Sequence, residues 1–172
     1  VIAVTPTIET ERLRLRGWRN GDLAPLVDFY ALDPGSVWVG GPLDDTDVWR
    51  RLMSFAGHWS LNGYGLFAIE EKSSGDWIGW CGLWQPVDFP ETELGWTLVE
   101  TARGKGLVTE AARAARDFAY RETQLPTLVS YIKPDNRASQ RVAERLACTH
   151  EGDIEIRGFT AGVWRHPPPP RV

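Results

Sequence analysis

The stretch Gly95–Ala112, GWTLVETARGKGLVTEAA, decides the fold of this chain, because a strand, a glycine-rich turn and a long helix meet within it. The strand is expected to end at Leu98, and the helix begins directly after Arg103–Gly106 (RGKG). The first turn of a helix presents unpaired N–H groups and the positive end of the helix dipole. Glycines let that backbone approach an anion closely, and Arg103 and Lys105 add positive charge. The stretch predicts an anion site; a plain solvated turn is the alternative.

Two common glycine-rich nucleotide motifs do not fit this stretch. A P-loop requires Ser or Thr after Gly-Lys, whereas Gly106 follows Lys105. The dinucleotide-binding fingerprint requires a third Gly or Ala, and Thr109 occupies that position. The sequence therefore supports neither a nucleoside triphosphate nor NAD as the ligand.

Outside this stretch, hydrophobic periodicity and turn residues predict regular elements along the chain. Apolar residues three and four apart, with capping residues and glycines at the ends, predict four helices. Alternating or short apolar runs between turn residues predict seven strands. The helices are expected at Leu23–Ala31, between the cap at 44–46 and the stop at 62–63, at Gly106–Arg121 and at Asn136–Ala147. The strands are expected at Ile8–Trp18, Tyr64–Glu71, Trp77–Trp84, Glu91–Leu98, Pro126–Ile132, Ile154–Ile156 and Phe159–Trp164. This order implies a mixed sheet flanked by helices.

Length and composition indicate an ordinary globular protein. The 172 residues, 19.3 kDa, predict one domain over residues 1–166 followed by a Pro-rich tail at 167–172. Hydrophobic residues make up 42% and charged residues 24%. The net charge of −4 does not indicate binding of the whole protein to nucleic acid or to an anionic membrane. No apolar run approaches the ~20 residues of a membrane span, and the first residues do not resemble a signal peptide. We therefore expect a cytoplasmic protein.

The cysteines, histidines and tryptophans indicate which kinds of site and core to expect. Two cysteines and three scattered histidines predict neither a disulfide framework nor a metal site. Cys81 and Cys148 lie in apolar surroundings and are expected to be small buried side chains. Most of the nine tryptophans should lie in the core, and some should line a pocket or an interface. Together with a hydrophobic final hairpin they suggest a homodimer.

Several segments in order resemble one family. Arg103–Ala111 (RGKGLVTEA) resembles motif A, Q/R-x-x-G-x-G/A, of the GNAT superfamily of acetyl-CoA-dependent N-acetyltransferases, with Arg103 first, Gly106 fourth and Val108 where Gly or Ala is usual. Three further segments resemble the ribosomal-protein N-acetyltransferase-like branch of the Acetyltransf_3 type. These are 10–16 (TERLRLR), 93–96 (ELGW) and 136–139 (NRAS), which resembles an N-x-x-S motif after the fifth strand.

The resemblance implies a fold and a ligand site. The fold is α+β (mixed αβ), a GNAT-like acyl-CoA N-acyltransferase with a seven-stranded, mostly antiparallel sheet, about four helices and a V-shaped splay between strands four and five. Acetyl-CoA is the implied co-substrate, with no metal. Its pantetheine would pair with the backbone of Trp96, Thr97 and Leu98, and its pyrophosphate with the N–H groups of Arg103, Gly104, Lys105, Gly106, Leu107 and Val108. Asn136, also an expected helix N-cap, would contact pantetheine, and Ser139 would face the thiol, unless it is only a small packed residue.

Acetyl transfer to an amine needs a base, an oxyanion donor and protonation of the thiolate. Glu91 and Glu93 share one face of a predicted strand, and burial would raise the pKa of a carboxyl there. Glu93 is the base candidate, with a solvent-facing carboxylate as the alternative. Relatives place a Tyr acid where this chain has Val142–Glu144, so Ser139, Tyr131 or water must substitute. His58 is a further candidate for the acceptor site.

These features predict acetyl-CoA-dependent transfer of an acetyl group to a primary amine by direct attack. The acceptor is a protein N-terminus or a small-molecule amine, and the sequence does not say which. A catalytically inactive acyl-CoA-binding module is one alternative. A protein-interaction domain, in which Gly104–Gly106 is only a turn, is the other.

Overall fold

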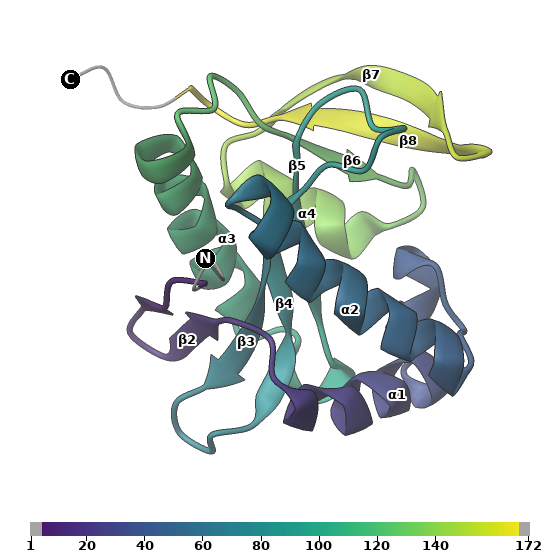
Figure 1. Cartoon of the computed structure of the whole chain (residues 1–172). Helices are drawn as coiled ribbons and strands as arrows, with labels where there is room; N and C mark the ends of the chain where they lie inside the picture. Colours follow the sequence, from purple (N-terminus) through teal and green to yellow (C-terminus); the bar gives the residue numbers. More distant parts are fainter. Residues whose placement is uncertain (1–4, 169–172) are drawn as a thin grey trace.

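The computed structural model describes residues 5–168, and its strands form one eight-stranded sheet in the order β1-β2-β3-β4-β5-β6-β8-β7 (Figure 1). The strands are Ile8–Glu9 (β1), Leu13–Arg16 (β2), Leu66–Glu71 (β3), Trp77–Trp84 (β4), Glu93–Leu98 (β5), Val129–Ile132 (β6), Thr149–Ile156 (β7) and Phe159–Arg165 (β8). Neighbouring strands are antiparallel except β5 and β6, which are parallel. The expected α+β (mixed αβ) fold is confirmed. Of the predicted tail 167–172, residues 169–172 lie outside the described residues.

The predicted first strand, Ile8–Trp18, is wrong, because it is two short antiparallel strands joined by a turn at 10–12. Thr10 Oγ1 donates to Glu110 Oε1 at 2.6 Å, and the Arg12 N–H donates to the same oxygen at 2.9 Å. Glu110 lies about a hundred residues away on another element, so no local pattern reveals the turn. This division gives eight strands instead of the predicted seven.

Four helices lie near their predicted positions. They are Leu23–Leu32 (α1), Asp45–Asn62 (α2), Leu107–Phe118 (α3) and Arg137–Arg145 (α4), with short turns at Asn20–Asp22 (η1), Pro34–Val39 (η2), Glu100–Ala102 (η3) and Ala119–Thr123 (η4). Asp44 caps α2 by accepting the Asp47 N–H at 2.8 Å, and Gly63 ends it in the left-handed region at φ +74°. The helix predicted to reach Arg121 ends earlier, at Phe118, where the wider turn of η4 begins.

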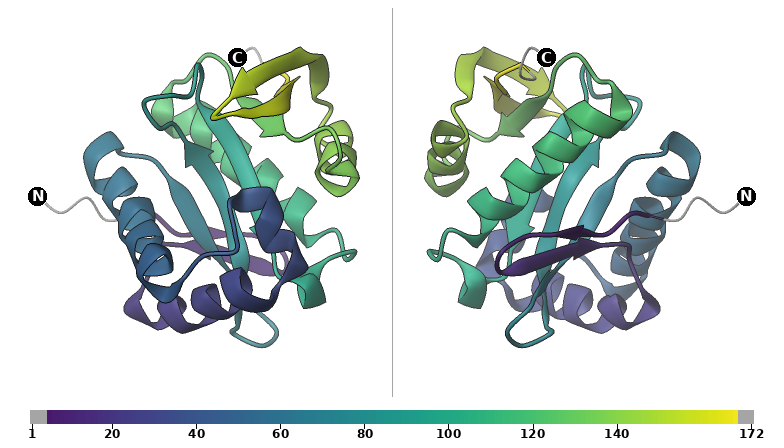
Figure 2. Two further views of the ribbon diagram at one scale, coloured as in Figure 1. Left: turned by 90° about the vertical axis from the view of Figure 1, so that its right-hand side faces the viewer. Right: turned by 90° about the vertical axis from the view of Figure 1, so that its left-hand side faces the viewer.

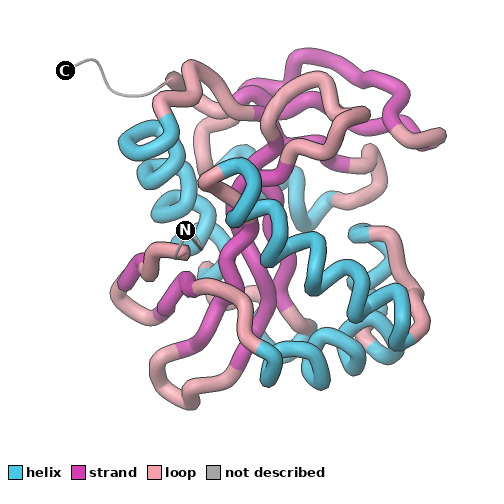
Figure 3. Tube along the Cα trace, in the orientation of Figure 1, coloured by secondary structure: helices cyan, strands magenta, loops and turns pink. Residues whose placement is uncertain are grey.

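Side chains on the two faces of the sheet form two separate cores. Alternate residues of one strand reach opposite cores: Phe67 packs on the α3 side, and Leu66 and Ala68 pack on the side of α1 and α2. Figure 2 shows α3 crossing one side of the strands. In Figure 3 the hairpin β7–β8 runs across the top, nearly crosswise to β3 and β4. The sheet therefore separates two layers of helices.

Most tryptophans belong to these cores, as predicted. Six of the nine are members of the two clusters or pack against them: Trp18, Trp59, Trp77, Trp80, Trp84 and Trp96. Trp38 and Trp49 are 40% and 50% exposed.

The predicted final hairpin is present as β7–β8, but its apolar side chains Ile156, Ala161 and Val163 are buried and do not offer a surface for dimerisation. Strand β7 is the exposed strand of this hairpin, and its sequence, THEGDIEI, is largely polar. The large exposed apolar side chains lie mostly on α1, η2 and α2: Leu32, Val37, Trp38, Trp49, Met53 and Leu61, with Val87 in a loop. The homodimer itself stays a prediction.

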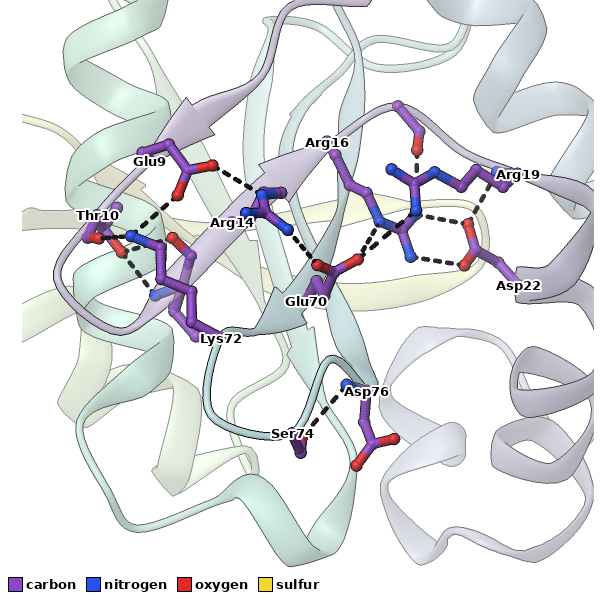
Figure 4. A network of polar contacts seen from close by, with 12 residues as sticks. Glu9, Thr10, Arg14, Arg16, Arg19, Asp22, Glu70, Lys72, Ser74 and Asp76 are labelled. Atoms are coloured by element: carbon purple, nitrogen blue, oxygen red, sulfur yellow. Dashed lines mark hydrogen bonds and ion pairs between the residues drawn. The ribbon is translucent and has the colours of Figure 1, made fainter.

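A buried ion network ties the start of the chain to the sheet (Figure 4). Arg16, the last residue of β2, is only 5% exposed. Its guanidinium binds Asp22 through two bonds of 2.9 Å and Glu70 through one of 2.8 Å. Hydrogen bonds to Arg16 and Arg14 hold the pKa of the Glu70 carboxyl below its ordinary value, against burial. The network fixes η1 and α1 against β3.

Replacing Asp22 by Ala should destabilise the protein by about 3–5 kcal/mol, because Arg16 would keep a buried charge with one carboxylate lost. Urea unfolding monitored by tryptophan fluorescence measures this change. The control is Glu122→Ala, which removes an exposed pair with Arg121 and should cost under about 1 kcal/mol. Equal losses in the two variants would contradict the assignment.

Candidate active site

The sheet opens between β5 and β6, where two side chains replace backbone pairing. Only Glu93 and Val129 are in register between these strands. In a continuing parallel ladder the Leu94 carbonyl would next accept the Tyr131 N–H. Instead the Tyr131 N–H donates to Glu93 Oε1 at 3.3 Å, and the Leu94 carbonyl accepts the Ser130 hydroxyl at 2.6 Å. The predicted splay between the fourth and fifth strands is thus confirmed.

A chain of buried side chains supports the Ser130 hydroxyl. His166 is 1% exposed, and its Nε2 lies 2.9 Å from Ser130 Oγ. Since Ser130 donates its one proton to Leu94, His166 must donate from Nε2, which leaves Nδ1 to accept from Cys148 Sγ at 3.3 Å. Burial lowers the pKa of His166 to about 3, so the ring is neutral. Cys148, expected to be a plain buried side chain, is half-buried and takes part in this chain.

The backbone of β5 beyond the contact presents alternate residues to the splay. The Val99 N–H donates to the Ile78 carbonyl at 2.9 Å, toward β4. Because peptide groups alternate sides along a strand, those of Thr97 also face β4, and those of Trp96 and Leu98 face the splay. Of the three residues expected to pair with pantetheine through their backbone, Thr97 is therefore directed away.

The glycine-rich turn places an open backbone at the start of α3. Gly104 and Gly106 both have φ +77°, a region that favours glycine, and Gly106 immediately precedes the helix. Leu107 is 2% exposed and anchors the first helical turn in the core. A Cβ at Gly104 would meet nothing within 4 Å, so the outer side of the turn is unobstructed. The arrangement fits an anion bound by main-chain N–H groups.

The side chain of Arg103 is already engaged and does not add a free charge, contrary to expectation. Its Nη2 binds Asp33 Oδ1 at 2.5 Å, and its Nε donates to the Leu98 carbonyl at 3.0 Å. Asp33 also accepts the N–H groups of Gly35 and Glu100, both at 2.7 Å. Arg103 therefore joins the turn to β5 and to the start of η2. Lys105 is exposed and is not among the residues that line the cavity beside this turn.

A cavity of about 1490 Å³ runs from the glycine turn to the opposite face of the sheet. Its lining includes Leu107 and Ala102 of the α3 core and also Phe55 and Trp80 of the α1–α2 core. Since these cores lie on opposite faces, the cavity passes through the sheet at the splay. A long substrate can enter from one face and meet a second substrate from the other.

Glu93 lies at this passage and is poised to exchange a proton. Its side chain is half-buried, lines the cavity and projects to the α1–α2 face, because Leu94 next to it packs in the α3 core. Burial raises its pKa to about 7, although the bond from the Tyr131 N–H and the charge of Arg157 oppose the rise. The alternative, in which the Glu93 carboxylate faces solvent, is therefore wrong.

Glu91 plays a different part from Glu93. It precedes β5, and both its carboxylate oxygens bind Arg165, at 2.5 and 2.9 Å. Its N–H donates to the Tyr131 hydroxyl at 3.2 Å. Glu91 is therefore a structural partner of β8, outside the cavity lining.

Asn136 and Ser139 lie together at the start of α4. The Asn136 side chain accepts the Ser139 N–H at 3.1 Å, which confirms the predicted N-cap. Both residues line the cavity, as does Val108. The Ser139 hydroxyl and the Tyr131 hydroxyl, whose pKa is raised by burial, are donors available at the splay.

His58, considered for the acceptor site, is not part of the cavity lining. Its Nδ1 lies 2.7 Å from the Tyr64 carbonyl, and its Nε2 accepts the Gln85 N–H at 3.4 Å. Its ring packs on Trp84 at 4.8 Å. Both nitrogens are used structurally, which leaves none for an acceptor amine.

Three arginines that the sequence analysis did not single out line the cavity on the side of α3 and α4. They are Arg113, Arg141 and Arg145, and none forms an ion pair with a carboxylate of residues 5–168. Arg141 and Arg145 are four residues apart on a predicted helix, so the sequence could have indicated that both lie on the same helix face. They add positive charge to the end of the cavity where the glycine turn lies.

A sheet opened by a splay beside a glycine-rich helix start is the architecture of acyl-CoA N-acyltransferases. Residues 12–149 match the family model described as an acetyltransferase (GNAT) domain, and the chain belongs to this family. The protein is therefore an acetyltransferase of the GNAT family, whose members use acetyl-CoA.

Three relatives illustrate the similarity. YkkB of Bacillus subtilis (strain 168) is 32% identical over 84% of this chain and 86% of its own length. The crystal structure of an acetyltransferase from Agrobacterium tumefaciens str. C58 is 40% identical, with a TM-score of 0.85 over 94% of each chain. The [ribosomal protein uS5]-alanine N-acetyltransferase of Escherichia coli (strain K12) is 25% identical over 92% of this chain and 86% of its own.

Within residues 5–168, no three His, Cys, Asp or Glu side chains are grouped so that they could hold a metal ion. In the same residues, no helix has the length and apolar character needed to cross a membrane.

Replacing Gly106 by Asp should weaken CoA binding about 100-fold or more, or about 2.7 kcal/mol. The carboxylate would repel phosphates where the turn offers N–H groups, and the backbone would be strained at φ +77°. Calorimetric titration with CoA measures the change. The matched control is Gly75→Asp, at φ +78° in the β3–β4 turn and away from the cavity, which should bind CoA normally. Unchanged affinity in Gly106→Asp would remove the turn from the site.

The Glu93 carboxyl should titrate near pH 7 when followed by carbon-13 NMR, against an ordinary value of 4.5. Between these values the folded protein holds a proton that the unfolded chain has lost. The free energy of unfolding should therefore fall as pH rises through this window, and Glu93→Gln should lack that part of the fall. Titration near 4.5 would contradict the assignment.

Proposed function

We propose that the protein transfers the acetyl group of acetyl-CoA directly to a primary amine, with Glu93 as the base. The observation that carries this proposal is the position of Glu93, a carboxylate of near-neutral pKa on the passage through the splay. A general base works best when its pKa is close to the working pH. No covalent enzyme intermediate and no metal are required.

Acetyl-CoA would approach from the α3 side. Its pyrophosphate fits the N–H groups of Gly104–Val108, since the Arg103 N–H donates to the Glu100 carbonyl at 3.1 Å. The unpaired Arg113, Arg141 and Arg145 suit its remaining phosphate. The Trp96 peptide groups and the Leu98 N–H, which face the splay, offer pantetheine a strand to pair with, whereas the Leu98 carbonyl accepts the Arg103 Nε–H. Asn136 and Ser139 lie on the same wall of the cavity.

The amine would approach from the α1–α2 face. Glu93 takes a proton from the ammonium or attacking amine, the nitrogen bonds to the acetyl carbon, and the carbon–sulfur bond breaks. The Trp96 N–H, facing the splay, would stabilise the oxyanion. Ser139, with Tyr131 as the second hydroxyl, would donate to the departing thiolate, which takes up a proton from water.

The acceptor class includes protein N-termini and small amines. The E. coli relative acts on an alanine of ribosomal protein uS5, which supports a primary α-amine as the reacting group. The open cavity on the α1–α2 face suits either kind of acceptor.

Replacing Glu93 by Gln should lower kcat by about 10²–10⁴, the usual contribution of a general base. CoA affinity should hardly change, because the amide keeps the shape and the cofactor is held by other residues. The acidic limb of the pH–rate profile, expected near pH 7, should flatten. Free thiol released from acetyl-CoA with a panel of amines measures the rate.

The matched control is Glu91→Gln, whose carboxylate binds Arg165 outside the cavity, so its loss should act mainly on stability. Full activity of Glu93→Gln across pH 6 to about 9 would exclude Glu93 as the base. CoA binding by the wild-type protein without thiol release for any amine would favour an inactive acyl-CoA-binding module.

A further inference from the structure

The α1–α2 end of the cavity carries more positive charge than its neighbours neutralise. Its charged lining residues are Glu93, Arg51, Lys133 and Arg157. Arg157 is neutralised by Asp88 through bonds of 2.6 and 2.7 Å. Arg51 and Lys133 form no ion pair with any carboxylate in the described part of the chain. The cations Arg51 and Lys133 therefore line the end of the cavity that would receive the acceptor amine under the proposed function.

Arg51 is half-buried on α2 and is held with part of its guanidinium free. Its Nη1 donates to the Tyr30 hydroxyl at 2.9 Å and to the Val39 carbonyl at 2.5 Å. The guanidinium lies over the Tyr30 ring at 5.2 Å. A Cβ at Gly40 would lie 3.3 Å from Nη2, so the glycine leaves that nitrogen uncovered. Because it has no carboxylate partner, the guanidinium can donate charge-assisted hydrogen bonds to an anionic ligand.

Lys133 reaches the same segment from the other side. It follows β6, and its Nζ lies 3.4 Å from the Val37 carbonyl and 5.0 Å from the centre of the Phe159 ring. Arg51 and Lys133 thus contact carbonyls on either side of Trp38, which lines the cavity and is 40% exposed. Two cations, one from α2 and one from the residue after β6, therefore contact the same segment η2.

We propose that the acceptor is a primary amine that also carries a carboxylate, and that Arg51 and Lys133 bind this carboxylate. This inference rests on the proposed function and specifies its acceptor. A simple ammonium ion would be repelled by the two cations, whereas a carboxylate forms charge-assisted bonds with them. The amine then faces Glu93, the one carboxylate on this end of the described cavity lining.

The walls between these groups suit an apolar or aromatic body. The cavity there is lined by Trp38, Phe55, Trp80, Trp84, Phe89 and Phe159. Such rings bind flat apolar groups, and a few polar contacts then fix the orientation of the ligand. The carboxylate belongs either to a free amino acid or to an acidic side chain near a peptide N-terminus, and both present the same chemistry.

Matched acceptors that differ only in the anionic group test the proposal. Thiol release from acetyl-CoA is compared for phenethylamine and phenylalanine, for butylamine and 4-aminobutyrate, and for the amidated peptides Ala-Asn-Ala and Ala-Asp-Ala. We expect kcat/KM to be about 10–100-fold higher for the anionic member of at least one pair. A preference for the anionic member of the first two pairs identifies a free amino acid as the source of the carboxylate. A preference for Ala-Asp-Ala in the last pair identifies a peptide as its source.

Arg51→Gln and Lys133→Gln should each bring this ratio toward one, while calorimetry shows unchanged CoA affinity. Arg50→Gln is the matched control, because Arg50 is exposed, binds Asp47 and does not line the cavity, so the ratio should persist. Thermal unfolding establishes that each variant is folded.

A ratio of one or less in all three pairs, with amines still acetylated, overturns the anionic acceptor and leaves the proposed function intact. A ratio unchanged in both Gln variants overturns the assignment to Arg51 and Lys133. Absence of thiol release with every amine counts against the proposed function instead. Calorimetric binding of the same pairs to the CoA complex then decides: equal affinities overturn this proposal, and tighter binding of the anionic member supports it.

Discussion

The site depends on the parallel contact between β5 and β6 stopping after one residue pair. The Leu94 carbonyl is satisfied by the Ser130 hydroxyl, and the Tyr131 N–H by the Glu93 carboxylate. Buried backbone groups must be paired, so without these two side chains the strands would continue their ladder. The gap that leaves the Trp96 peptide groups free is thus maintained by polar side chains, and the neutral His166 fixes the direction of the Ser130 bond.

Glu93 belongs both to this gap and to the chemistry. Its bond to the Tyr131 N–H favours the ionised form, but burial disfavours it more strongly and brings the pKa to about 7. The residue that holds the strands apart is therefore also the group able to exchange a proton there. Gly95 lies two residues later on the same face of β5. A Cβ at that position would lie 3.6 Å from the Glu93 carboxyl carbon, so the glycine leaves this side chain room.

Charge along the cavity is arranged by contacts between distant segments. Asp33 engages Arg103 and thereby ties the glycine turn to η2, while Arg51 and Lys133 reach η2 from α2 and β6. The turn that suits phosphate and the segment that flanks the acceptor end are thus neighbours. Positive charge remains free at both ends of the cavity, and the single near-neutral carboxylate lies at the passage between them.

The sequence by itself determined the helices, most of the strands and the glycine turn, because periodicity, caps and left-handed glycines are local properties. It also indicated Glu93, Asn136 and Ser139 through the ordered resemblance of short motifs. Tertiary structure alone decided that the first strand breaks at Thr10, that Arg103 is engaged by Asp33, that His58 is structural, and that Thr97 faces β4. Each of these depends on a partner distant in sequence or on the side to which a strand residue points. A linear pattern cannot specify which charges meet, and that meeting decides which charges remain free to bind a ligand.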